Sequence, residues 1–304
     1  MPIAKCEKIW MNGALVNWDE AKIHVLTHAL HYGSGVFEGI RCYHTKKGPA
    51  VFRLKDHMIR LAESGKAYYM NLPYTVDELC KATKDTIRAN NLDSCYIRPI
   101  AYRGYGEMGL NPLKSVIDVS IACWSWGTYL GEQGLKNGIT TIISKYRRIP
   151  NESLPLHAKA CGQYLNSILA KIEALEAKVD EAIMLDQTGL VAEGPGENIF
   201  MVKDGQLLTP ALGGILAGIT RNSILTIAKE EGIPSKEAEI DTETLLSADE
   251  LFFTGTAAEV TPIRKVDSTE IGKPGQITRK LQDRFFKIVR GEDKKHEDWL
   301  DYVR

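Results

Sequence analysis

The spacing of apolar and polar residues predicts alternating strands and helices along the first part of the chain. Asn12-Gly13 separates two short apolar runs, and this pair favours the positive φ angles of a tight hairpin turn. Thr75 and Glu78 form a capping-box pattern, which predicts the start of a helix. The elements predicted here are a hairpin over 9–16, helices over 56–69 and 75–90, and strands over 95–102 and 116–123.

The same alternation continues in the second half. A long helix is predicted over 162–179. We expect its buried face to consist of the apolar residues at helical spacing, Leu165, Ile168, Leu169, Ile172, Leu175 and Val179. Further elements are a strand over 181–185, a hairpin over 199–209, a helix over 220–232 and a strand over 251–254. This order predicts an α/β fold with mixed sheets.

A glycine-rich segment with large aromatic residues, 125–138, is the best candidate for an interdomain loop. It separates a small N-terminal domain, 1–124, from a larger C-terminal domain, 139–304. Trp126 and Tyr129 would be unfavourable in water, so we expect this loop to fold over another part of the protein. The polar tail from Gly291 is expected to be a loosely held terminus.

Composition narrows the class of protein. The 304 residues are 44% hydrophobic and 25% charged, as in ordinary globular proteins. A formal net charge of −1 gives no global field for nucleic acid or anionic lipid, and it suits small-molecule partners. The six cysteines include no Cys-x-x-Cys pair, and no apolar run approaches the length of a membrane span or follows the N-terminal charge. We therefore expect a cytoplasmic protein without a metal site.

Two charged residues are candidates for chemistry. Lys159 lies among small residues at the start of the long helix, and a partly buried, neutral lysine can form a Schiff base. A surface lysine before a helix is the simpler interpretation of that position. Glu193 is followed by glycines, and a carboxylate there could face a pyridine nitrogen. It could equally be a charged residue of a surface hairpin.

Three other segments could bind anions. Gly218–Arg221 opens a predicted helix with backbone N–H groups at its positive end, and Gly255–Ala258 offers a second set of donors after a strand. Simple capping would explain either segment. Tyr96 and Arg98 share one face of a strand. On the core side the arginine must meet an anion, whereas on a solvated edge the pair has no function.

Two other patterns predict little. His24, His28 and His31 stand at helical spacing but lack the carboxylate of a zincin motif. The glycine run over 33–39 misses the dinucleotide-binding spacing by one residue and leads into a strand rather than a helix. Neither a Walker loop nor a Gly-x-Ser-x-Gly elbow occurs.

Taken together, these segments resemble the class IV aminotransferases, the fold type IV pyridoxal-phosphate enzymes, and most of all the bacterial branched-chain amino acid aminotransferases. The most specific part is the spacing from Glu193 through Asn198 and Thr209 to Arg221. Pro195 departs from the small residue usual in the family. The segments that carry the resemblance are 10–13, 27–33, 36–41, 96–99, 157–164, 193–200, 207–209, 216–221 and 255–259. It implies two α/β domains with the cofactor in the cleft between them.

The resemblance implies a role for each matched cofactor position. Lys159 corresponds to the lysine that holds pyridoxal 5′-phosphate and moves the substrate proton. Glu193 corresponds to the partner of the pyridine nitrogen, and Tyr164 to the donor to the phenolic oxygen. The phosphate-binding positions are Arg60, Ile219, Thr220 and Thr256. The remaining cofactor-binding positions are Gly196, Leu216 and Gly255.

The resemblance also implies the substrates: L-leucine, L-isoleucine and L-valine, with 2-oxoglutarate as amino acceptor in a ping-pong reaction. Arg98, with Tyr32 and Tyr129, could bind the γ-carboxylate of glutamate. The positions that match the α-carboxylate site are Tyr96, Thr256 and Ala257. Those that match the side-chain pocket and its rim are Tyr32, Phe37, Met108, Leu110, Trp126 and Tyr129.

Family members build each site from two subunits, so the resemblance implies at least a homodimer and allows a homohexamer. Met108 and Leu110 are the candidates for residues lent to the neighbour. A D-amino-acid aminotransferase or an aminodeoxychorismate lyase is the nearest alternative, and Tyr96, Arg98 and the Gly-Thr-Ala-Ala segment favour the branched-chain interpretation. The presence of Lys159, Glu193 and Tyr164 together argues against a regulatory relative without turnover. A nicotinamide-dependent enzyme is supported only by the imperfect glycine run.

Overall fold

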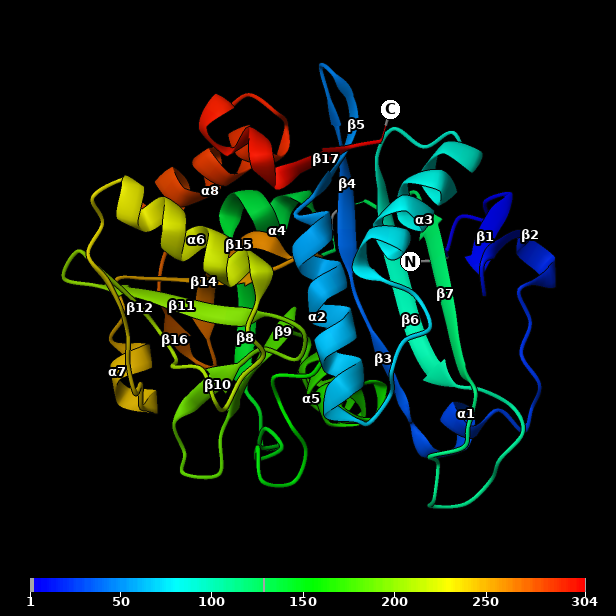
Figure 1. The fold of residues 1–304 in the computed structure, drawn as a ribbon. Helices are drawn as coiled ribbons and strands as arrows, with labels where there is room; N and C mark the ends of the chain where they lie inside the picture. The colour runs from blue at the N-terminus through cyan, green and yellow to red at the C-terminus, as the bar shows by residue number, and fades with distance from the viewer. Residues whose placement is uncertain (1–2, 128, 304) are drawn as a thin grey trace. The chain divides into compact units, whose positions relative to one another are not determined.

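The computed structural model describes residues 3–127 and 129–303. They form two compact units, neither of which is one continuous stretch of chain. The first comprises Met1–Trp126, Ala158–Gly162 and Ile288–Arg304, and the second comprises Gly127–His157 and Gln163–Lys287. Each unit has one sheet and its own helices, which confirms the α/β class (Figure 1). The division at 124 and 139 stays a prediction.

The sheet of the first unit has the strand order β17-β5-β4-β6-β7-β1-β2, with β3 beside β6, and its paired strands are antiparallel. Its strands are β1 Lys8–Met11, β2 Ala14–Asn17, β3 Gly35–Phe37, β4 Ile40–Thr45, β5 Gly48–Phe52, β6 Cys95–Arg103, β7 Ile117–Trp124 and β17 Leu300–Tyr302. Its helices are α1 His28–Tyr32, α2 Leu54–Ala67 and α3 Val76–Ala89, with 3-10 turns at Trp18–Glu20 and Lys294–Trp299.

Local signals in this unit fold as predicted. The hairpin turn has Asn12 at φ 47° and Gly13 at φ 95°, the left-handed conformation that the Asn-Gly pair favours. Thr75 caps α3 by accepting the backbone N–H of Glu78. Helices α2 and α3 pack on the sheet, and apolar side chains such as Leu54, Met58 and Leu61 are completely buried in the core.

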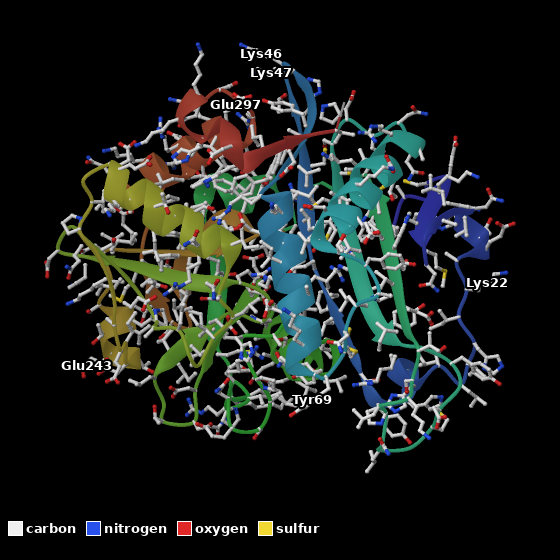
Figure 2. All side chains as sticks on the ribbon, in the orientation of Figure 1. Lys22, Lys46, Lys47, Tyr69, Glu243 and Glu297 are labelled. Carbon is white, nitrogen blue, oxygen red and sulfur yellow. The ribbon has the colours of Figure 1, made fainter. Side chains whose placement is uncertain are left out.

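The C-terminal segment is held in place, so the expectation of a loose tail after Gly291 is wrong. β17 pairs with β5, with Leu300 opposite Phe52. Lys47 lies beside Glu297, with Nζ and Oε1 2.6 Å apart (Figure 2). The tail is polar in composition, but its backbone adds an edge strand, and strand pairing depends on backbone groups rather than on side-chain hydrophobicity.

The sheet of the second unit has the order β10-β9-β8-β15-β14-β11-β12-β13, with β16 beside β15. β8 is parallel to both β9 and β15, β12 is parallel to β13, and the other pairs are antiparallel, so this sheet is mixed as predicted. Its strands are β8 Ile139–Ile143, β9 Glu181–Leu185, β10 Val191–Glu193, β11 Asn198–Lys203, β12 Gln206–Thr209, β13 Ser235–Glu237, β14 Glu250–Gly255, β15 Glu259–Val266 and β16 Thr269–Glu270.

The helices accompanying this sheet are α4 Gly131–Asn137, α5 Tyr164–Glu176, α6 Ile219–Glu230, α7 Thr242–Leu246 and α8 Gln276–Val289, with a 3-10 turn at Cys161–Gln163. The predicted interdomain loop therefore contains a short helix, α4. Over the described residues, none of the helices combines the length and the apolar character needed to cross a membrane.

Helix α5 forms where predicted, but the prediction of its buried face is wrong. Five of the six predicted side chains are 44–68% exposed, and these are Leu165, Ile168, Leu169, Ile172 and Leu175. Only Val179, which follows the helix, packs against the buried cluster. The buried residues are instead Ser167, Ala170 and Ala174, and the two alanines pack against Ala182 and Met184. Small residues let the helix lie close to strand β9. The spacing of the large apolar side chains therefore does not predict which face of the helix is buried.

Candidate active site

The main chain of Lys159 is tied to elements of the first unit. Its carbonyl accepts the N–H of Phe37 at 3.0 Å, and its own N–H donates to Ser64 Oγ on α2 at 3.0 Å. Ala158 and Ala160 on either side are buried, and Lys159 itself is half-buried. Its ammonium lies 5.0 Å from the centre of the Phe37 ring. An amine held this way beside an aromatic wall has the fixed position that covalent attachment to a cofactor requires.

Arg60 is oriented by a buried carboxylate. Its Nε and Nη2 donate to the two carboxylate oxygens of Glu38 at 2.7 and 2.8 Å, a bidentate pair. Glu38 is completely buried and also contacts His57 Nδ1 at 2.6 Å. Burial alone would raise the pKa of Glu38, but the charges of Arg60 and His57 hold it well below its ordinary range. The pair fixes the direction of the Arg60 guanidinium.

Tyr96 and Arg98 share one face of β6, as the period of two predicts, and this face is opposite to that of Cys95 and Ile97 in the core of the unit. Tyr96 is 5% exposed, and Arg98 Nη2 donates to its hydroxyl at 3.0 Å. The Arg98 guanidinium lies 4.7 Å from the centre of the Phe37 ring, and the rings of Tyr96 and Trp126 are 4.3 Å apart. Trp126 thus folds over another aromatic residue, as expected. Phe37 contacts both Lys159 and Arg98, so the structure brings these candidates together.

Glu193 is clamped within the second unit. A register shift between Val191 and Glu193 in the β9–β10 pair re-aims the side chain. Oε1 accepts Arg148 Nε at 2.8 Å, while Oε2 accepts Asn198 Nδ2 at 3.1 Å and the N–H of Leu216 at 3.3 Å. Glu193 is 5% exposed, so it is not a residue of a solvated hairpin.

The predicted phosphate-binding segments of the second unit meet near Asn198. Helix α6 begins at Ile219 and Thr220, whose backbone N–H groups belong to the first helical turn and have no partner further back in the helix. A Cβ on Gly218 would overlap Asn198 Oδ1, and one on Gly255 would lie 3.4 Å from the carbonyl oxygen of Gly196. Glycines, helix-end donors and the Thr220 hydroxyl suit a phosphate group. The residues present therefore fit pyridoxal phosphate.

Three more candidates are placed in the second unit. Tyr164 is the first residue of α5. The Tyr129 ring centre lies 5.6 Å from the ammonium of Lys171. Thr256 and Ala257 are half-buried in the turn between β14 and β15, directly after Gly255.

Tyr32, Met108 and Leu110 are the exposed candidates of the first unit. Their exposed fractions are 45%, 47% and 89%. His28 links the two segments that carry them, because its Nε2 contacts the carbonyl oxygen of Gly109 at 2.9 Å and its ring lies 4.6 Å from that of Tyr32. Their side chains thus face solvent on their own chain, unlike Phe37 and Tyr96. In the part of the chain that is described, His, Cys, Asp and Glu side chains form no group of three that could hold a metal ion.

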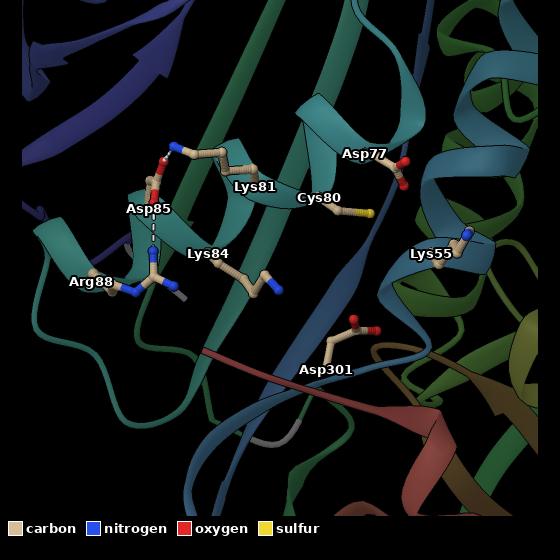
Figure 3. A pocket seen from close by; sticks show the side chains of 8 residues that line it. All are labelled: Lys55, Asp77, Cys80, Lys81, Lys84, Asp85, Arg88 and Asp301. Carbon is tan, nitrogen blue, oxygen red and sulfur yellow. Dashed lines mark hydrogen bonds and ion pairs between the residues drawn. The ribbon is translucent and has the colours of Figure 1, made fainter. Parts of the chain in front are cut away.

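Two surface pockets of the first unit are not lined by Lys159. One, of about 400 Å³, is lined by charged residues of α2, α3 and β17 around Cys80 (Figure 3). Burial, with the negative charges of Asp301 and Asp77, raises the pKa of Cys80 to about 11, so this thiol is a poor nucleophile. The other, of about 370 Å³, is mostly apolar and includes Leu30 and Tyr102.

Comparison with known proteins agrees with this arrangement. A family model for amino-transferase class IV matches residues 35–266. The chain is a class IV aminotransferase. It is 48% identical to the branched-chain-amino-acid aminotransferase of Pseudomonas aeruginosa over 97% of each chain. It is 46% identical to that of Escherichia coli strain K12, over all of this chain and 99% of the relative.

Solved structures of this aminotransferase family show the same fold. The Escherichia coli branched-chain amino acid aminotransferase superposes with a TM-score of 0.97 at 46% identity, over 99% of this chain and all of that one. The T.th. enzyme with pyridoxamine 5′-phosphate gives a TM-score of 0.96 at 46% identity, and its complex with N-(5′-phosphopyridoxyl)-L-glutamate gives 0.95 at 45%, each over 99% of both chains. The predicted family, fold type and enzyme class are confirmed.

Sequence reasoning did not single out three buried residues that contact the candidates or their partners. Glu38 pairs with Arg60 and is itself contacted by His57, and Arg148 pairs with Glu193. Glu38 lies within the Phe37-Glu38-Gly39 segment, and a charge in an apolar stretch predicts a buried partner. Nothing in the sequence pairs Arg148 with Glu193, 45 positions away.

Proposed function

We propose that the enzyme transfers the amino group of L-leucine, L-isoleucine or L-valine to 2-oxoglutarate by a ping-pong reaction, with pyridoxal 5′-phosphate held by Lys159. One observation carries this: Lys159, Phe37 and Arg98 form one continuous contact in a chain nearly half identical to branched-chain-amino-acid aminotransferases. The T.th. relative solved with a phosphopyridoxyl-glutamate compound supports glutamate as one substrate.

Each cofactor residue has one task in this proposal. Pyridoxal phosphate, when bound, supplies the ring that withdraws electrons from the substrate α-carbon. Lys159 Nζ accepts the α-proton and delivers it back, because its main chain is fixed at both N–H and C=O. Glu193 accepts a hydrogen bond from the pyridine nitrogen, and Tyr164 donates to the phenolic oxygen. The phosphate is bound by Arg60, Ile219, Thr220 and Thr256.

The substrate residues explain why one pocket takes both an apolar and an acidic side chain. Phe37 and Trp126 offer an apolar wall to leucine, isoleucine and valine, where each methylene contributes about 1–3 kcal/mol. Arg98 lies over Phe37 and can bind the γ-carboxylate of glutamate without disturbing that wall. Tyr96, Thr256 and Ala257 bind the α-carboxylate, and Tyr129 closes the rim.

We further propose that two copies of the chain complete each site, as a homodimer or a larger assembly. Tyr32, Met108 and Leu110 are exposed on their own chain, yet they match substrate-pocket positions. A residue lent to a neighbour explains both facts. Mixing a Lys159→Ala variant with a Leu110→Asp variant should restore activity, because mixed dimers then hold one intact site. Two variants that stay inactive when mixed would contradict lending.

The deciding experiment is the visible spectrum of the purified enzyme with pyridoxal phosphate. L-isoleucine should convert the cofactor band to that of the pyridoxamine form, and 2-oxoglutarate should restore it. Borohydride reduction followed by peptide mapping should place the cofactor on Lys159, and Lys159→Ala is the control. A band that responds to D-alanine but ignores L-isoleucine would instead assign the D-specific activity. No band at all would refute the proposal.

A further inference from the structure

Arg148 contacts Glu193 but is not among the positions that match cofactor-binding residues of the family. We propose that Arg148 is a positioning residue that keeps Glu193 a carboxylate anion, so that the proton between Glu193 and the cofactor stays on the pyridine nitrogen. This rests on the proposed function, because it assumes that Glu193 faces that nitrogen. Arg148 would then influence how strongly the bound pyridine ring withdraws electrons from the substrate.

The geometry joins Arg148 rigidly to Glu193. The two residues are 6% and 5% exposed, and Nε and Oε1 are 2.8 Å apart. The main chain of Arg148 is held at both ends, since its N–H donates to the Leu185 carbonyl at 2.8 Å and its carbonyl accepts Gln187 Nε2 at 2.9 Å. The guanidinium therefore has a fixed anchor at the end of β9.

The three protein groups seen on the Glu193 carboxylate are all donors. Arg148 Nε meets one oxygen, and Asn198 Nδ2 and the Leu216 N–H meet the other. A carboxylate has about four acceptor positions, and a ring N–H is a donor of the kind that it accepts. A proton on Glu193 would face donors and lose one of these hydrogen bonds. Hydrogen bonding and the Arg148 charge thus favour the same ionised form.

Glu197 shows what burial does to a carboxyl in this part of the protein. Glu197 is buried, and one of its oxygens accepts the N–H of Gly196 at 3.0 Å. Burial, then the negative charge of Glu181, raise the pKa of Glu197 to about 8 against the opposing effects of Gly196 and Lys171. Glu193 is equally buried and differs by its direct contact with a guanidinium.

Burying the Arg148 guanidinium is partly unfavourable for the stability of the fold. Its Nη1 is buried without a hydrogen-bond partner among the described residues. A buried ion pair is often replaceable by apolar residues without loss of stability. Its contribution here is therefore electrostatic. Lowering the proton affinity of Glu193 leaves the shared proton on the ring, and a protonated ring is the stronger electron acceptor.

The test uses the holoenzyme loaded with pyridoxal phosphate carrying ¹⁵N in the ring. The nitrogen chemical shift reports directly whether the ring holds the proton, and it is followed across pH. In the wild type we expect a protonated ring. Arg148→Met should shift the shared proton from the ring toward Glu193 by about tenfold or more, and Arg148→Lys should restore most of the wild-type distribution because it keeps the charge. Arg103→Met is the matched control, since it removes a similarly buried arginine whose hydrogen bonds go to the carbonyls of Pro112 and Tyr68.

Two results would refute the role of Arg148, and a third would refute the proposed function. An Arg148→Met enzyme that binds the cofactor and keeps the wild-type nitrogen shift at every pH overturns the role of Arg148. If Arg148→Met does not fold, Arg148→Gln takes its place, because its amide can still donate to Glu193 without the charge. An unchanged titration in that variant also refutes the role. A wild-type protein that takes up no labelled cofactor refutes the proposed function instead.

Discussion

Glu38 contributes to the acid dependence of stability in the first unit. It is completely buried, its charge is balanced by Arg60, and it also contacts His57 Nδ1. Because the pKa of Glu38 is held below its ordinary value, the ionised pair stabilises the fold above about pH 4.5. That stabilisation is lost as the pH falls below this value.

Replacing Glu38 with glutamine should expose this dependence. We expect Glu38→Gln to unfold more easily near neutral pH by about 3 kcal/mol, because the partly buried Arg60 loses its counter-charge. The difference from wild type should shrink as the pH falls below about 4.5. Urea unfolding across pH measures both effects. Glu297→Gln removes the exposed Lys47 pair and should leave stability unchanged. A constant difference at every pH would contradict the assignment.

Glu197 should show the opposite dependence on pH. The pKa of Glu197 is raised from 4.5 to about 8, so the fold is destabilised as the pH rises through this range. Glu197→Gln keeps an acceptor for the Gly196 N–H and adds a donor that can face Glu181. We expect this variant to be more stable than wild type near pH 7 and nearly equal to it near pH 4.5. Calorimetry at both values checks this, and a variant less stable at both would disprove it.

At the scale of elements, the start of α6 depends on a close approach that only glycine allows. A Cβ on Gly218 would overlap Asn198 Oδ1, and Asn198 in turn donates to Glu193 and to the Leu216 carbonyl. Gly218→Ala should therefore weaken cofactor binding by about tenfold or more, as other disrupted supporting groups do. Fluorescence titration with pyridoxal phosphate measures it. Gly214→Ala, where a Cβ meets open space, should bind normally.

Helix α5 gives a second test at this scale. Its contact with β9 is made by small residues, so Ala170→Leu should destabilise the fold by about 1–3 kcal/mol through overpacking. Leu169→Ala, at a 44% exposed neighbour, should cost clearly less. Chemical unfolding of both variants compares them directly. A larger loss at Leu169 would mean that its side chain is covered in the assembled protein.

For the whole molecule, cofactor binding should be coupled to folding. A ligand that binds only the folded chain stabilises it by about 2.7 kcal/mol at 100 times its Kd. In a protein of this size that raises the Tm by roughly 4 °C. Pyridoxal without its phosphate should give a smaller shift, because Arg60 and the α6 N–H groups then have no ligand. Thermal unfolding that is equal with both compounds would contradict the assigned phosphate site.

Local structure and family membership could be predicted from the sequence alone. Asn12-Gly13 and the Thr75 capping box act through neighbouring residues, so their signals need no tertiary contact. The residue types and spacings around Lys159 and Glu193 indicate the family because they match the motifs of its members. The helical spacing of apolar residues also locates α5, because that spacing depends only on neighbouring positions in the sequence.

The partners of these residues, by contrast, are set by the folded chain. The buried face of α5 follows from its contact with β9, and the tail after Gly291 is held by pairing with β5. The pairing of Glu38 with Arg60, and of Arg148 with Glu193, joins positions far apart in the chain. Burial and charge depend on distances in space rather than along the sequence, so the electrostatic environment of the site emerges only once the chain is folded.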